Sequence, residues 1–176
     1  MNIRNNTFWQ MVVIGLLLSS FAVSVFARGV NQTDKEFLAE TFSNNLPKSR
    51  VVWIKGDLRT EISTILGHEY AGLRIRYWQQ ASRTAWILEE IGKESPITFG
   101  IVISDNKIEH ITVLAYRESR GGEIQQRAFT RQFTNATLSE QKLDRHIDGI
   151  SGATLSVRAM TSVATMALYL TQFINQ

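Results

Sequence analysis

The chain has 176 residues, of which 44% are hydrophobic and 20% charged, a composition typical of one globular domain with a single core. Its 19 basic and 16 acidic residues are interspersed, so the charge pattern argues against nucleic acid as a partner. Cysteine is absent, which excludes disulfides, thiolate metal sites and thiol catalysis. Because His68, His110 and His146 lack the spacing of metal ligands, we expect no metal site.

The first 27 residues differ in composition from the rest. An apolar run from Met11 to Leu18 follows Arg4, and Val25 and Ala27 fit a small-residue cleavage site. This pattern predicts a secretory signal peptide. An uncleaved membrane anchor is the alternative, because Trp9 to Ala27 approaches the length that spans a bilayer. Under both interpretations we expect the remaining residues to be extracytoplasmic, in the periplasm, secreted or held at the membrane by the N-terminal segment.

The next residues alternate between helical and strand-like patterns. We expect a helix over Asp34–Phe42 capped by Thr33 or Asp34, a strand over Val51–Ile54, and a helix over Leu58–Leu66 closed by Gly67. From Leu73 onward apolar and polar residues alternate, and the short links predict an antiparallel meander. The four strands of this meander are expected over residues 73–78, 84–90, 98–103 and 108–116.

Two helices are expected after the meander. Residues 123–133 fit a helix with four inward side chains, those of Ile124, Ala128, Phe129 and Phe133. Residues 133–147 are polar and turn-rich, and residues 155–174 fit a long core helix. A second membrane span is the competing interpretation of that helix, but Arg158 and several hydroxyl side chains disfavour it in hydrocarbon. The fold class is therefore α+β, an antiparallel β meander packed with helices and ending in a C-terminal core helix.

The stretch from Asp148 to Ser156, DGISGATLS, concentrates small residues just before that last helix. It is one residue from the G-x-S-x-G motif of α/β-hydrolases, but no acidic residue and no histidine follows Ser151, so the chain order excludes that triad. It also lacks the lysine of a G-x-x-x-x-G-K-[ST] phosphate loop.

A third interpretation places Thr154 at the start of the final helix. Helix N-termini present free N–H groups and the positive end of the helix dipole, which favour a phosphate group. Gly152 and Ala153 would let a bulky phosphate-bearing group approach the backbone. The alternative is that Ser151 or Thr154 only caps the helix, the commonest role of such residues.

The string from Asp148 to Thr154 resembles the D-x-x-[ST]-G-A-[ST] flavinylation motif of the FMN-binding domain family, found in the C subunit of sodium-pumping NADH:quinone reductase and the G subunit of the Rnf complex. The resemblance implies FMN bound to Thr154 through a phosphoester made by a separate flavin transferase from FAD with a divalent metal. It implies that Asp148 serves recognition or reaction at the transferase and that Ser151 orients the loop or bonds the phosphate. The other expected cofactor-binding residues of this motif are Gly152, Ala153 and Leu155.

A second loop, from Glu118 to Gly122, is similar to the E-T-P-G-x-G loop that lies near the flavin in that family. Here Arg120 replaces the proline and the second glycine is displaced. The similarity adds Glu118 and Gly121 to the expected cofactor-binding residues. It predicts a compact stand-alone member, with residues 1–27 as leader, 28–71 as an N-terminal extension and 72–176 as the FMN-binding domain.

The function implied by the resemblance is electron transfer rather than stand-alone catalysis, because the sequence carries no second catalytic constellation. The implied partners are a membrane redox protein as donor and an extracytoplasmic acceptor such as a cytochrome. An exported module that binds no flavin, with Thr154 as a helix cap, is the alternative, and a flavoenzyme acting directly on a small substrate is a third interpretation. Five further side chains are candidate flavin or phosphate contacts whose commoner roles are core packing or solvation: Trp53, Trp78, Trp86, Arg145 and His146.

Overall fold

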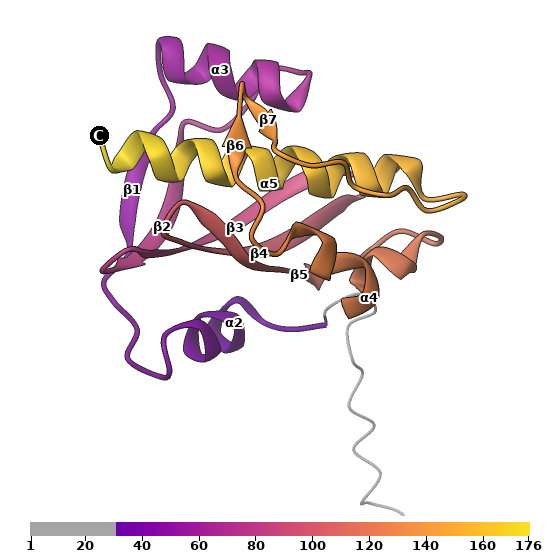
Figure 1. Ribbon diagram of the computed structural model, residues 1–176, viewed down its shortest axis with the longest axis horizontal. Coiled ribbons are helices and arrows are strands. Elements are labelled where there is room, and N and C mark those ends of the chain that lie inside the picture. Colours follow the sequence, from indigo (N-terminus) through magenta and orange to yellow (C-terminus); the bar gives the residue numbers. More distant parts are fainter. Residues whose placement is uncertain (1–30) are drawn as a thin grey trace, which may run out of the picture.

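The structure is a computed structural model that describes residues 31–176 (Figure 1). The predicted signal peptide or anchor over residues 1–27 lies outside these residues. The N-terminal half holds the elements α2 (Asp34–Thr41), β1 (Arg50–Trp53), α3 (Asp57–Leu66), β2 (Arg74–Gln80) and β3 (Arg83–Ile91). The rest holds β4 (Pro96–Ser104), β5 (Lys107–Ala115), η1 (Gly122–Gln125), α4 (Arg127–Thr130), η2 (Arg131–Phe133), β6 (Leu138–Ser139), β7 (Lys142–Leu143) and α5 (Thr154–Ile174).

The five long strands form one antiparallel sheet in the order β1-β2-β3-β4-β5. The strands β2 to β5 each pair with the next along the chain, as the short links predict, so the four-stranded meander is confirmed. The strand β1 belongs to this sheet, because Val52 pairs with Ile75 of β2. The two-stranded β6–β7 hairpin is separate. With its helices the molecule is α+β, as expected.

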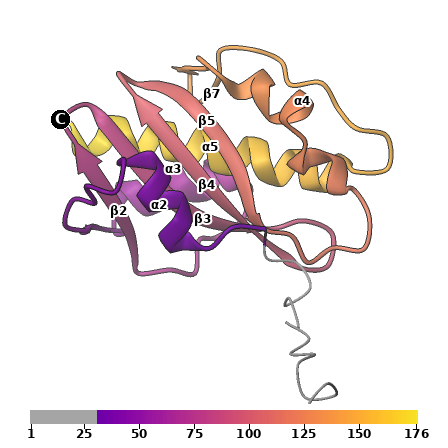
Figure 2. The ribbon, with the colours of Figure 1, turned by 90° about the horizontal axis from the view of Figure 1, so that it is seen from below.

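Helices cover both faces of the sheet. In Figure 1, α5 and α3 lie above the sheet and α2 lies below it; Figure 2 shows α2 in front of the sheet and α5 behind it. The central turns of α5 are buried, because small residues such as Ala164 and Ala167 let the helix approach the strands closely. The indole N–H of Trp86 on β3 donates to the hydroxyl of Thr171 on α5 at 2.9 Å, which fixes the position of α5 over the sheet.

The second face has its own smaller core around α2. Thr33 caps this helix, accepting from the Glu36 amide at 3.2 Å, while the Glu36 carboxylate accepts from the Thr33 amide at 2.8 Å. The buried side chains of Phe37 and Leu38 then pack on the sheet. Asn31 begins the described chain beside β5, where its amide donates to the carbonyl of Leu114 at 2.8 Å.

The prediction of a single helix over residues 123–133 is wrong. The structure has three short turns there, η1, α4 and η2, because Gln126 adopts an extended backbone between the first two. Ile124 and Phe129 are five residues apart, so one continuous helix would point them about 140° away from each other. The break lets both side chains reach the core, while Ala128, expected to face inward, is exposed.

The last helix is confirmed, and it begins at Thr154, one residue before its expected start. Over the described residues 31–176, α5 included, no helix has both the length and the apolar character needed to cross a membrane.

Candidate functional site

A pocket of about 500 Å³ opens where α5 begins. Its walls come from the small-residue motif, from the loop that follows β5 and from the β3–β4 hairpin. The volume falls within the range of roughly 300–1,000 Å³ that is usual for small-molecule sites. The lining residues are Lys93, Glu118, Ser119, Arg120, Gly152, Ala153, Thr154, Leu155 and Ser156.

Thr154 is the first residue of α5, and its side chain is exposed at the pocket. The N-cap is Ala153, whose carbonyl accepts from the Val157 amide at 3.0 Å, and no side chain caps the helix. The capping hydrogen bond expected in the alternative interpretation of Ser151 or Thr154 is therefore not formed. Amides in the first turn of a helix lack intrahelical acceptors, so the Thr154 hydroxyl lies beside N–H groups and a dipole that favour an anion.

Two glycines with positive φ angles lie beside the pocket and play different roles. Gly121 has a φ of 83°, and a Cβ placed on it would lie 2.8 Å from the Cβ of Ala153. The loop after β5 therefore packs directly against the residue before Thr154, and only glycine permits this approach. Gly152 has a φ of 80°, and a Cβ there would meet nothing within 4 Å. The motif is thus packed against Gly121 on one side and open to an approaching group on the other.

Tyr116 links the loop after β5 to α5. Its hydroxyl donates to the carbonyl of Arg120 and lies 3.3 Å from the hydroxyl oxygen of Ser156 on α5. Burial raises the pKa of Tyr116, which keeps its proton available for these bonds. This role was not predicted, because in the sequence Tyr116 only ends a strand.

Glu118 joins the pocket to the β3–β4 hairpin. One carboxylate oxygen accepts from the amides of Lys93, Glu94 and Ser95 at 2.6, 2.7 and 3.0 Å. Burial of Glu118 raises its pKa, but these three amides lower it, and the net shift is downward. Glu118 lines the pocket with one oxygen already bonded to the hairpin, and its expected place near the flavin stays a prediction. Neither this bond nor the place of Lys93 was predicted from the sequence, because no local pattern relates residues 25 positions apart.

The structure places the first residues of the motif outside the pocket lining. Asp148 and Ser151 are exposed, and the Asp148 amide donates to the Gln132 side chain at 2.8 Å. An exposed position is accessible to a second protein, which agrees with the expected role of Asp148 at a transferase. That role stays a prediction.

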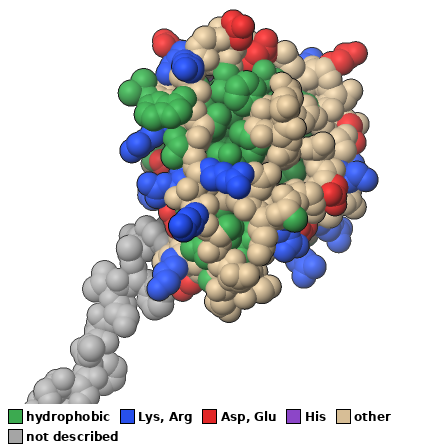
Figure 3. Space-filling model, turned by 90° about the vertical axis from the view of Figure 1, so that its left-hand side faces the viewer, with side chains coloured by type: hydrophobic (Ala, Val, Ile, Leu, Met, Phe, Trp, Pro, Cys, Tyr) green, Lys and Arg blue, Asp and Glu red, His purple; other side chains and the backbone are tan. Residues whose placement is uncertain are grey.

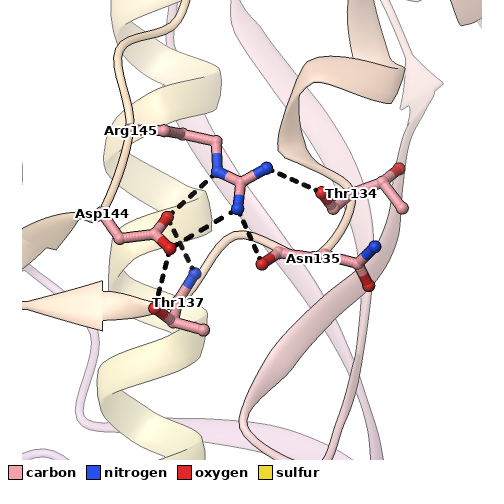
Figure 4. Close-up of polar contacts among 5 residues, drawn as sticks. All are labelled: Thr134, Asn135, Thr137, Asp144 and Arg145. Carbon is pink, nitrogen blue, oxygen red and sulfur yellow. Dashed lines mark hydrogen bonds and ion pairs between the residues drawn. The ribbon is translucent and has the colours of Figure 1, made fainter.

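Arg145 holds the segment that leads into the motif (Figure 4). Its guanidinium donates to the carbonyls of Thr134 and Asn135 at 3.0 and 2.9 Å and to the Asp144 carboxylate at 3.0 Å. Together with hydrogen bonds from Thr137, the arginine lowers the pKa of Asp144 to about 2. Arg145 is thus engaged in a structural network rather than at the pocket, and His146 does not line the pocket either.

The candidate tryptophans lie away from the pocket. Trp86 is fully buried and stacks on Tyr77 at 5.0 Å between ring centroids, and Trp78 packs in the core around α2, so both are core residues. Trp53 on the edge strand β1 is 58% exposed, with the Arg74 guanidinium 6.0 Å from its ring centroid. Figure 3 shows the side of the molecule where β1 and the C-terminus lie, with Lys and Arg side chains scattered among apolar and neutral ones.

Comparison with known proteins adds one match. Residues 92–169 match the FMN-binding domain family. No curated protein sequence matches the chain. The matched segment begins in the β3–β4 hairpin and ends within α5, so it includes every residue that lines the pocket.

Proposed function

We propose that this chain, whose residues 92–169 belong to the FMN-binding domain family, carries FMN joined covalently to Thr154. The observation that carries the proposal is the position of Thr154. It is exposed at the pocket, and it is the first residue of a helix that no side chain caps. Gly152 leaves the backbone open, since a Cβ there would meet nothing within 4 Å, and the helix N-terminus offers N–H groups to a phosphate. The residues present therefore fit the phosphate-bearing end of FMN.

The attachment is a phosphoryl-group transfer that a separate flavin transferase catalyses. Thr154 Oγ forms a bond to the phosphorus on the FMN side of FAD, and the pyrophosphate bond to AMP breaks. The hydroxyl proton is released and AMP leaves, so the protein gains FMN minus one water. The phosphodiester keeps one negative charge, which the N-terminus of α5 stabilises.

The bound group would supply exchange of one or two electrons, and the protein would supply its attachment and electrostatic setting. We propose that the protein relays electrons from a membrane-bound donor to an extracytoplasmic redox protein such as a cytochrome. The apolar leader predicted over residues 1–27 supports export, and a covalent bond prevents loss of the flavin where it is not readily replaced.

The attachment is tested by the intact mass of the protein co-produced with a flavin transferase. We expect the wild type to gain the mass of FMN minus water and Thr154→Ala to gain nothing. Thr60→Ala is the matched control, because Thr60 is an exposed threonine near the start of another helix, α3, and we expect it to be flavinylated fully. An unmodified wild type, or FMN retained in Thr154→Ala, contradicts the assignment.

The relay is tested with the flavinylated protein and membranes from cells that produce it. We expect the flavin absorbance to bleach when the membranes are supplied with a reductant, and to return when an oxidised cytochrome is added. Rapid turnover of a small acceptor without any protein partner would instead identify a flavoenzyme.

A further inference from the structure

Two cationic side chains line the pocket from different loops. Lys93 comes from the β3–β4 hairpin and Arg120 from the loop after β5, where the similar family loop has proline. Glu118 is the one acidic residue among the lining residues, so the formal charge of the lining is positive. Lys93 also lies 3.1 Å from Glu94, but both side chains are mostly exposed, at 72% and 69%. An ion pair this exposed contributes little and leaves the lysine available to a nearby anion.

The position of Lys93 depends on Glu118. The Glu118 carboxylate accepts from the backbone amides of Lys93, Glu94 and Ser95, which holds the tip of the hairpin against the pocket. Three amides on one carboxylate oxygen are charge-assisted hydrogen bonds, stronger than bonds between neutral groups. Glu118 is therefore a positioning residue for the hairpin that carries Lys93.

We infer that Lys93 and Arg120 raise the reduction potential of the flavin attached at Thr154, and that Glu118 acts by positioning Lys93. This inference rests on the proposed function. Two electrons from the donor and one proton convert oxidised FMN to its anionic reduced form, which carries one more negative charge. A positive charge near the ring stabilises the product of that step more than its reactant, so it favours reduction.

The test is the midpoint potential of the flavinylated protein, measured by equilibration with a redox dye of known potential. The variants are Lys93→Gln, Arg120→Gln and the double variant. Lys107→Gln is the control, since Lys107 is an exposed lysine of the β4–β5 hairpin, at the opposite end of β4 from the pocket. The intact mass of each protein is measured first, to establish that it carries FMN.

At low salt we expect the double variant to have about a tenfold lower ratio of reduced to oxidised flavin at a fixed potential, which for two electrons is about 30 mV. Each single variant should shift the potential less, in the same direction, and the control should not shift it. The shift should shrink toward zero in 1 M salt, where the screening length is only about 3 Å. A purely structural defect would persist at high salt.

Two substitutions separate the charge of Glu118 from its positioning role. Glu118→Gln removes the charge but keeps an oxygen for the three amides, whereas Glu118→Ala removes both. We expect a lower potential in the Ala variant than in the Gln variant, and we expect this difference to vanish when Lys93→Gln is also present, because the two residues act together.

The outcomes are distinguishable. Absence of the FMN mass in the wild type overturns the proposed function and this inference together. Full flavinylation with equal potentials in wild type and double variant overturns the inference alone, as does a shift that persists in 1 M salt. A difference between Glu118→Ala and Glu118→Gln that survives in Lys93→Gln overturns the positioning role.

Discussion

Two segments lead into the start of α5, and they are held in opposite ways. Residues 134–145 are held by side chains, because Arg145 donates to the carbonyls of Thr134 and Asn135 and to the Asp144 carboxylate, which also accepts from the Thr137 amide. The motif from Asp148 to Thr154 is held by backbone approach, with Gly121 against Ala153, and its hydroxyl groups face outward. A polar side chain whose bonds are filled belongs to the framework, whereas an exposed one beside an open backbone is available for chemistry.

The largest expected effect comes from filling the contact that holds the motif. Gly121→Ala places a Cβ 2.8 Å from the Ala153 Cβ at a φ of 83°. Backbone strain of about 1–2 kcal/mol and overpacking of about 1–3 kcal/mol should together lower the free energy of unfolding by about 2–5 kcal/mol. Urea denaturation measures this change, and flavin attachment should fall with it.

Gly149→Ala is the control for that substitution, since a Cβ on Gly149 meets nothing within 4 Å. We expect it to change stability by less than about 0.5 kcal/mol. Equal losses in the two variants would show that the contact between Gly121 and Ala153 does not hold the motif.

The next effect comes from breaking the side-chain network of the other segment. Asp144→Asn removes the charge that Arg145 faces and should cost about 1–2 kcal/mol, a value reduced by the partial exposure of the pair. Flavin attachment should be unchanged, because the network lies outside the pocket. Glu123→Gln, which changes the charge of another exposed carboxylate, should change stability little. Loss of flavin without loss of stability in Asp144→Asn would contradict this division of roles.

The same network predicts an acid dependence. The pKa of Asp144 is lowered to about 2, so its contribution is complete above the ordinary value near 3.8 and is lost as the pH falls through about 2. The difference in unfolding free energy between wild type and Asp144→Asn should therefore be constant from pH 7 to about pH 4 and shrink below that. A difference that grows on acidification would exclude the ionised pair as its source.

A smaller effect is expected at the open side of the motif. Gly152→Ala imposes a φ of 80° on alanine but meets nothing within 4 Å, so only backbone strain of about 1 kcal/mol should appear. Its methyl group would point into space that an approaching cofactor needs, so flavin attachment should fall more than stability does. Denaturation and intact mass on the same sample measure both quantities. A fully flavinylated variant would show that this side is not the route of approach.

Elements whose pattern repeats along the chain could be predicted from sequence. The strands β2 to β5, which appear in the sequence as apolar segments separated by turn residues, and the helix α5, with its helical spacing of apolar residues, were each placed within a few residues. The segment from Ile124 to Phe133 could not be predicted, because the positions of its apolar residues are set by the core that they reach and not by a helical period. The motif indicated Thr154, but the bond from Glu118 to the hairpin joins residues far apart in sequence, and only the folded sheet brings them together.

The smallest expected effect lies at His68, on the loop between α3 and β2. Its Nδ1 is 3.0 Å from the Glu69 carbonyl and its Nε2 is 3.0 and 3.1 Å from the two oxygens of Glu90, so the protonated ring donates at both nitrogens. These bonds raise the pKa of His68, and the bond to the Glu69 carbonyl has the largest effect. Its contribution is therefore complete below the ordinary value of 6.5 and is lost as the pH rises through the higher folded-state value.

The difference in unfolding free energy between wild type and His68→Gln should thus shrink between pH 6 and pH 9, the reverse of the trend at Asp144. Solvent screens a side chain that is half exposed, so the change should be small and should weaken further with salt. Burial lowers the pKa of His110, which gives stability the opposite slope with pH, so the wild type alone does not isolate His68. Only the difference between the two proteins does, and a difference that stays constant over this range would show that the ring does not bind Glu90 as a cation.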